Sequence, residues 1–188
     1  MVFFSADYHL CHNNIVNLCN RPWLPEENND RVVEAHNSVV SPGDTVYLLG
    51  DTCWSKNIEV WQDFCRRLNG NLIFLPGNHD KLYHNCRLEL EYENEWVVYR
   101  DRERECYFAD NGNSLHQVVL DKIVLVLFHY PMLSWNGWNR GSVHLFGHCH
   151  GNMDDKVSGR CFDVGIDSAK CGHKPVSLTQ VKEWLKDV

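Results

Sequence analysis

The stretch Val46-Tyr47-Leu48-Leu49-Gly50-Asp51 is a continuous apolar run that ends in a glycine and a carboxylate. A short apolar run without alternation is typical of a strand that is buried on both faces of a sheet. Similar runs recur along the chain, and each ends in side chains that can bind metals. They are Val2-Phe3-Phe4 before Asp7 and His9, Leu72-Ile73-Phe74-Leu75 before Asn78 and His79, residues 123–128 before His129, and Val143-His144-Leu145-Phe146 before His148 and His150.

Segments with helical spacing lie between these runs. Residues 30–40 and 58–68 are predicted helices, because their apolar side chains recur every three or four positions. Near the C-terminus, Ser177 followed by Gln180 predicts a capping box at the start of a closing helix. The alternation of strands with helices favours the α/β class.

Residues 81–117 interrupt this alternation. The segment is rich in charge, and it contains the possible strand Trp96-Val97-Val98-Tyr99 and the turn signal Asp110-Asn111-Gly112-Asn113. We expect an irregular, partly β excursion, and the sequence leaves its part in the pocket or in an interface open.

The composition excludes several classes of protein. The chain has 188 residues, of which 44% are hydrophobic, and this suits a single domain over residues 1–188. A net charge of -7 argues against stable binding of duplex nucleic acid or of anionic membranes. We find neither a secretory leader nor an apolar run near the roughly 18 residues of a membrane span. Nine cysteines without a Cys-x-x-Cys pair predict free thiols in a reducing cytoplasm.

The polar groups that follow the strands predict a metal centre. Ligands bind beyond the carboxyl ends of strands in open α/β sheets, so one site could collect all of these groups. Oxygen and imidazole donors without thiolate favour Mn²⁺ first, with Fe, Zn²⁺, Co²⁺ or Ni²⁺ as alternatives. The donors outnumber what one ion with open positions takes, so we expect two ions that share a carboxylate. The groups that could supply ligands are Asp7, His9, Asp51, Asn78, His79, His129, His148 and His150.

Each motif has an ordinary structural explanation when it is taken alone. Asp7-Tyr8-His9 resembles a polar strand end, Gly50-Asp51 a turn, and Gly77-Asn78-His79-Asp80 a turn or a helix cap. Gly147-His148-Cys149-His150-Gly151 is more telling, because imidazoles at i and i+2 share one side of a strand end and rarely serve packing. The combination supports the metal centre more strongly than any one motif.

The chain resembles the calcineurin-like metallophosphoesterase superfamily in the order and approximate spacing of these motifs. It is most similar to small bacterial and phage members, in which the first motif continues into a histidine and an asparagine, and in which glycine commonly stands where this chain has Cys11. The resemblance implies a four-layer β-sandwich flanked by helices instead of one doubly wound sheet, with a dinuclear site at the strand carboxyl ends. The motifs are Asp7-x-His9, Gly50-Asp51, Gly77-Asn78-His79-Asp80, His129 and Gly147-His148-x-His150, and the continuation is His12-Asn13 and Cys19-Asn20-Arg21-Pro22.

The resemblance also implies a mechanism. A hydroxide that bridges the two ions would attack phosphorus while the ions neutralise charge on the phosphoryl oxygens. His79 would face the phosphate and protonate the leaving group or stabilise its charge. Asp80 would fix the tautomer of His79 or cap a helix. The implied ligand sets are Asp7, His9, Asp51 and His150 for one ion, and Asp51, Asn78, His129 and His148 for the other.

Further side chains are candidates for substrate binding. Arg21 could bind a phosphate in bidentate fashion or form a salt bridge, and His12 could contact the substrate. Asn13 could do the same or cap a helix. Trp135 and Arg140 lie in a later loop, where the indole could stack on a nucleobase or simply pack.

The expected function is hydrolysis of a small or nucleotide-like phosphodiester. The alternative is a phosphomonoesterase such as a protein phosphatase. A third hypothesis is a scaffold of the same fold without catalysis. Polar groups gathered at strand ends disfavour the scaffold, because their desolvation is costly unless metals or partners compensate. The sequence leaves the oligomeric state open.

Overall fold

Two β-sheets pack face to face in the computed structural model, which describes residues 1–80, 90–93, 96–99, 107–108 and 115–188. The first sheet has the strand order β11-β1-β2-β3-β6, and the second has the order β10-β9-β8-β7. Strands β1, β2, β3 and β6 are parallel, as are β8, β9 and β10, whereas β11 and β7 run antiparallel to their neighbours. The first sheet consists of β1 (Val2–Ser5), β2 (Thr45–Leu49), β3 (Asn71–Leu75), β6 (Tyr107–Phe108) and β11 (Val176–Ser177); the second consists of β7 (His116–Leu120), β8 (Ile123–Leu127), β9 (Val143–Phe146) and β10 (Cys161–Asp163).

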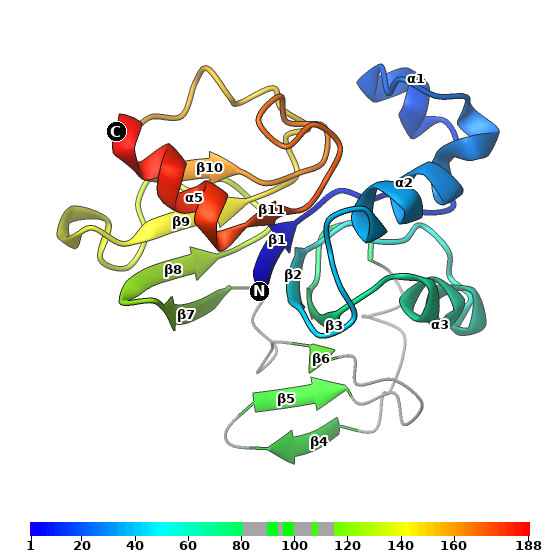
Figure 1. Ribbon diagram of the computed structural model, residues 1–188, viewed down its shortest axis with the longest axis horizontal. Helices are drawn as coiled ribbons and strands as arrows, with labels where there is room; N and C mark the ends of the chain where they lie inside the picture. Colours follow the sequence, from blue (N-terminus) through cyan, green and yellow to red (C-terminus); the bar gives the residue numbers. More distant parts are fainter. Residues whose placement is uncertain (81–89, 94–95, 100–106, 109–114) are drawn as a thin grey trace.

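Helices flank these sheets. Figure 1 shows α2 and α3 on one side of β1, β2 and β3, and the second sheet on the other side. The mixed architecture of two sheets flanked by helices confirms the fold implied by the family resemblance. The helices are α1 (Ile15–Cys19), α2 (Asn28–Asn37), α3 (Ile58–Arg67) and α5 (Leu178–Trp184), with 3₁₀ turns η1 (Pro25–Glu27), η2 (Trp138–Arg140) and η3 (Leu185–Asp187).

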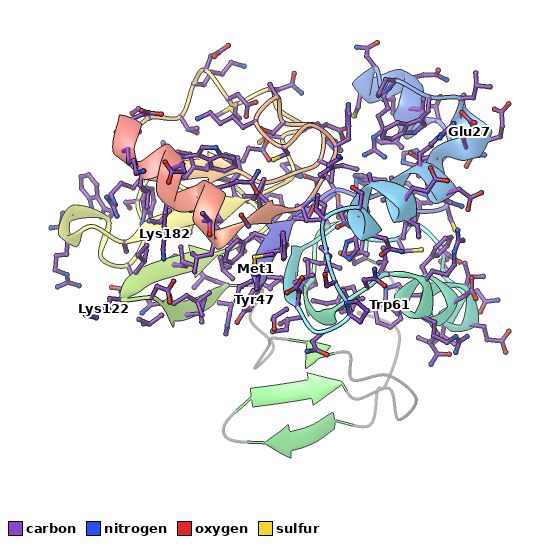
Figure 2. The ribbon with its side chains drawn as sticks, viewed as in Figure 1. Met1, Glu27, Tyr47, Trp61, Lys122 and Lys182 are labelled. Carbon is purple, nitrogen blue, oxygen red and sulfur yellow. The ribbon has the colours of Figure 1, made fainter. Side chains whose placement is uncertain are left out.

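The first sheet is buried on both faces, which explains its unbroken apolar runs. Val46 and Leu48 of β2 pack with Trp61 of α3, while Tyr47 and Leu49 face the second sheet. Figure 2 shows Tyr47 and Trp61 on opposite sides of β2. Leu178 and Val181 of α5 join the core between the sheets. Among the described residues, no helix has the length and apolarity that crossing a membrane requires.

The predicted helices form, with shifted bounds. The first begins before residue 30 and ends at Asn37, three residues earlier than expected, and the second ends at Arg67. The capping box is confirmed, because Ser177 Oγ accepts from Gln180 N at 3.2 Å and Gln180 Oε1 accepts from Ser177 N at 2.9 Å. The strand over residues 96–99 is β5, which pairs with β4 (Leu90–Glu93). The expected turn over 110–113 lies outside the described residues.

Backbone hydrogen bonds continue between the loops that leave these strands. Asp7 N donates to Gly50 O at 3.0 Å and His9 N donates to Asp51 O at 2.9 Å, which ties the loop after β1 to the loop after β2. Gly147 N donates to His129 O at 3.0 Å, which ties the loop after β9 to the end of β8. The polar residues that follow the strands of the two sheets therefore lie in one region.

Candidate metal centre

Two clusters of metal-ligand atoms lie at the carboxyl ends of the strands. The first cluster contains Asp7, His9 and His150, and the second contains Asp51, His129 and His148. Within each cluster, one ligand atom from every residue lies within 4.8 Å of the others. Asn78 joins the second cluster, because its Oδ1 lies 3.0 Å from His129 Nε2 and 3.0 Å from His148 Nδ1. All the candidate ligands are thus brought together.

Asp51 lies between the two clusters. Its Oδ2 atom is 3.6 Å from His9 Nε2 in the first cluster and 3.5 Å from His129 Nε2 in the second. Its Oδ1 atom accepts a hydrogen bond from His79 N at 2.8 Å. One oxygen is therefore held by backbone, and the other faces both clusters.

The ligands occupy strained backbone positions. Asp7, His9, Asp51, His148 and His150 have φ angles of 61°, 49°, 51°, 70° and 48°, in the left-handed region that non-glycine residues rarely adopt. Strain of this kind gathers at functional sites. Strand alternation does not place His148 and His150, because β9 ends at Phe146 and both histidines follow it with positive φ.

Two glycines leave room for the carboxylates. A Cβ atom at Gly77 would lie 2.3 Å from Asp51 Oδ1, and one at Gly147 would lie 2.4 Å from Ala6 Cβ and 2.8 Å from Asp7 Oδ2. These distances are far below van der Waals contact. Any side chain at either position would therefore displace a ligand or the adjoining loop.

The donor atoms fit divalent metal ions. His9 is 3% exposed, and neither of its ring nitrogens has a hydrogen-bond partner among the described residues. Burial lowers the pKa of His9 to about 3, so the ring is neutral and its lone pair faces carboxylates. Buried polar atoms normally have partners, and a cation would supply one here. Both clusters also offer nitrogen and oxygen donors, as expected from the sequence.

The two central carboxylates differ in charge state. Burial raises the pKa of Asp7 to about 7. Burial also favours a higher pKa for Asp51, but the His129 imidazole beside it holds the pKa of that carboxyl at about 2. A bound cation favours the ionised form of both groups, because it supplies the largest local charge.

Each cluster orients one imidazole through its second nitrogen. In the second cluster, His129 Nδ1 donates to Leu49 O at 2.8 Å, which leaves Nε2 towards Asp51. In the first cluster, His150 Nδ1 lies 2.7 Å from Asp167 Oδ2 and so leaves Nε2 for a metal. The sequence interpretation missed Asp167. Asp167 lies in the turn after β10, beyond the strand end that served as the signal for the other ligands.

An aromatic stack lies beside the clusters. The Trp54 indole is 4.2 Å from the His12 ring at an angle of 25° and 4.3 Å from the His79 ring at 32°. The His79 ring is 5.7 Å from that of His9. His12 and His79 therefore lie near the first cluster, and Trp54 contacts both rings. No pattern in the sequence had indicated Trp54.

Asp80 has a role that the sequence interpretation did not include. Its carboxylate accepts backbone hydrogen bonds from Asp51 N at 2.6 Å, Thr52 N at 2.9 Å, Cys53 N at 3.3 Å and Gly77 N at 2.8 Å. These bonds tie the Asp51 loop to the loop after β3. Asp80 thus positions a ligand loop instead of fixing the His79 tautomer.

The expected phosphate contact of Arg21 is wrong. The side chain is buried, and all its donors have protein partners. Nε and one terminal nitrogen bind Asp167 at 2.9 Å each, and the remaining bonds go to Asp7 O, Tyr8 O and Asn28 Oδ1. The salt-bridge alternative is therefore the correct one for this arginine.

Asn13, Trp135 and Arg140 are the remaining candidates for substrate binding. Asn13 is exposed, and it does not cap a helix because Asn14 is the N-cap residue of α1. Trp135 packs against His144 with ring centroids 5.3 Å apart, as the packing alternative expects. Arg140 ends the exposed turn η2. Trp135 and Arg140 both belong to the loop between β8 and β9, which begins beside the ligand His129.

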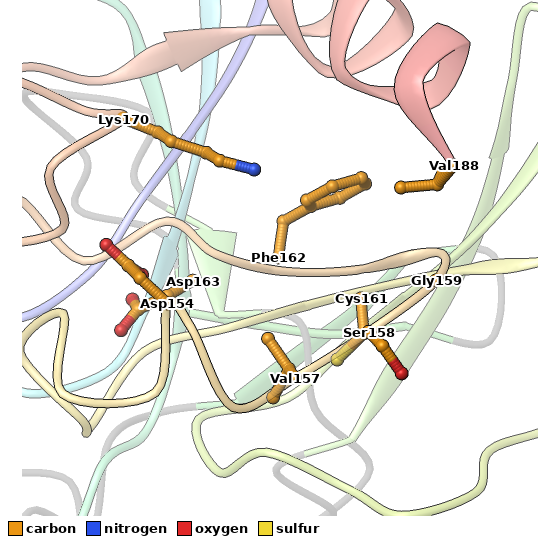
Figure 3. A pocket seen from close by; sticks show the side chains of 9 residues that line it. All are labelled: Asp154, Val157, Ser158, Gly159, Cys161, Phe162, Asp163, Lys170 and Val188. Carbon is orange, nitrogen blue, oxygen red and sulfur yellow. The ribbon is translucent and has the colours of Figure 1, made fainter.

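A cavity of about 230 Å³ lies elsewhere, as Figure 3 shows. Phe162, Val157 and Cys161 form an apolar wall, and Lys170 lies over the Phe162 ring at 5.2 Å. The residues that line the cavity include none of the candidate ligands.

Comparison with known proteins assigns the chain to a family. A sequence model of the calcineurin-like phosphoesterases matches residues 2–177. The chain belongs to the calcineurin-like phosphoesterase family. An uncharacterised protein of Methanocaldococcus jannaschii is 30% identical over 194 residues, covering 98% of this chain and 91% of that protein. The crystal structure of a protein of unknown function from Aquifex aeolicus has a TM-score of 0.66 at 20% identity, covering 98% of each chain, and supports the same fold.

Family membership confirms the resemblance found in the sequence. Calcineurin-like phosphoesterases use divalent metal ions to hydrolyse phosphate esters, and the clusters of this chain supply suitable ligands. The chain is therefore a metal-dependent phosphoester hydrolase by family.

Proposed function

We propose that the chain hydrolyses a small or nucleotide-like phosphodiester at a two-ion centre. The position of Asp51 carries the proposal, because its Oδ2 atom lies within 3.6 Å of a ligand nitrogen in each cluster. A carboxylate oxygen between two ligand sets is the arrangement that lets two cations share one ligand.

The ligand sets follow from the two clusters. Asp7, His9, Asp51 and His150 would hold one ion, and Asp51, Asn78, His129 and His148 the other. Mn²⁺ is our first choice for both positions, with Fe, Zn²⁺, Co²⁺ or Ni²⁺ as alternatives. When bound, such ions supply Lewis acidity that activates water and offsets charge on the phosphoryl oxygens.

His79 is the candidate catalytic residue. It protonates the leaving oxygen, or stabilises its charge, from a position beside the first cluster. Trp54 holds one face of the His79 ring, and the His79 backbone holds Asp51 Oδ1. Asp80 keeps the loop of Asp51 in register with that of His79.

The engagement of Arg21 removes one candidate for the recognition of a phosphomonoester. A phosphomonoester carries up to two negative charges, and recognition of such a group typically uses an arginine. Arg21, the arginine nearest in sequence to the first ligand pair, directs all its donors to protein acceptors. A diester carries a single charge, which the metal ions would offset.

We also propose that the chain forms a single catalytic domain and that it is located in the cytoplasm. The family match over residues 2–177 suits one catalytic domain over residues 1–188. The seven cysteines that the structure describes are free thiols, which suits the reducing cytoplasm.

Turnover of a chromogenic phosphodiester, compared with that of the matching monoester, tests the proposal. The protein is stripped with a chelator and reloaded with Mn²⁺, with Asp51→Asn and His79→Ala as variants. We expect diester turnover that Asp51→Asn abolishes and that His79→Ala lowers by about 100-fold or more at unchanged metal content. A monoester preference would replace the diesterase by a phosphatase, and no metal-dependent turnover of either ester would contradict the proposal.

A further inference from the structure

The carboxylate of Asp167 connects an arginine to the first cluster. Asp167 has a side chain that is 2% exposed. Its Oδ1 accepts from Arg21 Nε at 2.9 Å, and its Oδ2 accepts from the second terminal nitrogen of Arg21 at 2.9 Å. The same Oδ2 lies 2.7 Å from His150 Nδ1. Both oxygens are thus engaged, one of them by the imidazole of a ligand.

Arg21 also holds the backbone that carries the other ligands of this cluster. It donates to Asp7 O at 2.8 Å and to Tyr8 O at 3.0 Å. Asn28, which accepts from Arg21 at 2.9 Å, donates to His9 O at 3.3 Å. Three consecutive carbonyls are therefore fixed in a loop where Asp7 and His9 have positive φ.

We propose that Asp167, held by Arg21, is a positioning residue that sets the metal affinity of the first cluster independently of the second. The inference rests on the two-ion centre proposed above. A carboxylate that accepts from Nδ1–H fixes the tautomer of His150, aims Nε2 at the ion and makes it a better donor. The second cluster has a neutral carbonyl, Leu49 O, in the corresponding place on His129.

The charges agree with this geometry. The Arg21 guanidinium pairs with the buried Asp167 carboxylate at 2.9 Å, and the same carboxylate lies 2.7 Å from His150 Nδ1. A carboxylate beside the ring favours the positive charge that a metal ion bound at Nε2 would bring.

Cys19 offers a competing arrangement. Its Sγ lies 3.3 Å from His150 Nδ1, and Cys19, His150 and Asp167 could together hold a thiophilic metal. Such an ion would have to displace the short contact between Asp167 and Nδ1 and compete with Arg21 for the carboxylate. The positioning role leaves all these contacts intact.

Calorimetric titration of the chelator-stripped full chain with Mn²⁺ tests the inference. The variants are Asp167→Asn, which keeps the shape, and Arg21→Gln with Asp167→Asn, which removes both charges together and leaves no unpaired buried ion. Asp154→Asn is the matched control, because Asp154 accepts from Ser168 and Ala169 beside this loop without contacting His150. Thermal unfolding of each metal-free protein monitors the fold.

We expect two binding steps in the unmodified protein, one of which weakens by about 10–100-fold in both Asp167 variants while the other is unchanged. The control should keep both steps. Unchanged metal affinities with a lower stability of the metal-free protein would make the pair purely structural and overturn the inference. Equal weakening of both binding steps would also overturn it. A further variant, Cys19→Ser, tests the competing arrangement, and loss of affinity in this variant alone would overturn the inference too. If the unmodified protein binds a single ion that Asp167→Asn weakens, the inference stands and the two-ion proposal fails.

Discussion

The two ligand clusters are built from similar residues but are held in different ways. The first cluster is closed: Asp7 and His9 are 0% and 3% exposed, and a buried ion pair orients His150. The second cluster is open: His148 and Asn78 are exposed, and His129 is oriented by a neutral backbone carbonyl. If each cluster of the proposed centre holds one ion, we expect the ion of the closed cluster to exchange more slowly than that of the open cluster.

The largest effect is expected at Asp51, which both clusters share. Asp51→Asn removes the charge between them, so neither ion should survive desalting and turnover should fall by more than about 100-fold. His148→Ala should instead remove a single ion, from the open cluster. Elemental analysis of the desalted proteins measures both outcomes. An Asp51→Asn protein that kept two ions would contradict the shared role of this carboxylate.

Two glycine substitutions probe the clusters separately. Gly77→Ala pushes a Cβ against Asp51 in the open cluster, and Gly147→Ala pushes one against Ala6 and Asp7 in the closed cluster. Each should lower the free energy of unfolding by about 1–3 kcal/mol. Chemical denaturation of the metal-free proteins measures this loss. Gly43→Ala is the control, because nothing lies within 4 Å of its added Cβ. Equal stability of all three variants would refute the tight packing.

A chelator should remove the two metal ions at different rates. A chelator in excess should extract the ion of the open cluster at least about 10-fold faster than that of the closed cluster, because His148 is exposed and His9 is buried. A metallochromic chelator in a stopped-flow instrument records both phases. His148→Ala should abolish the fast phase. A single phase in the unmodified protein would contradict the expected difference in exchange between the two ions.

The smallest effect is expected at Cys11, in the loop that follows the closed cluster. Its φ of 64° strains any residue with a Cβ atom. Cys11→Gly should stabilise the protein by about 0.5–1 kcal/mol, because relief of strain exceeds the added entropy of the unfolded chain. Urea denaturation measures the change. Cys11→Ala keeps the strain and should give no gain, so equal effects would refute this explanation.

The strand-end pattern predicted much of this site. Buried strands made of continuous apolar residues and followed by Asp, Asn or His were recognisable because both faces of the first sheet are covered. The rule does not identify Asp167, because β10 ends at Asp163 and Asp167 lies in the turn that follows. It did not find Trp54, because one aromatic residue near a ligand has no periodicity.

The sequence left the role of Arg21 open between phosphate binding and a salt bridge, and it did not include the role that Asp80 has in the structure. In the sequence each is a charged residue near a ligand motif, and such a residue suits substrate contact or proton transfer. In the structure, both side chains form their hydrogen bonds with backbone groups and buried partners. Partners distant in sequence, such as Asp167 for Arg21, cannot be identified from local spacing.

The sequence by itself determined the fold class, the family and the set of candidate ligands, because these depend on local periodicity and on motif order. Only the tertiary structure decided how each imidazole is oriented and which groups hold the ligand loops. Those properties depend on contacts between loops separated by up to 141 residues, as in the bond from His148 N to Asp7. They also depend on left-handed turns that aim neighbouring side chains in different directions.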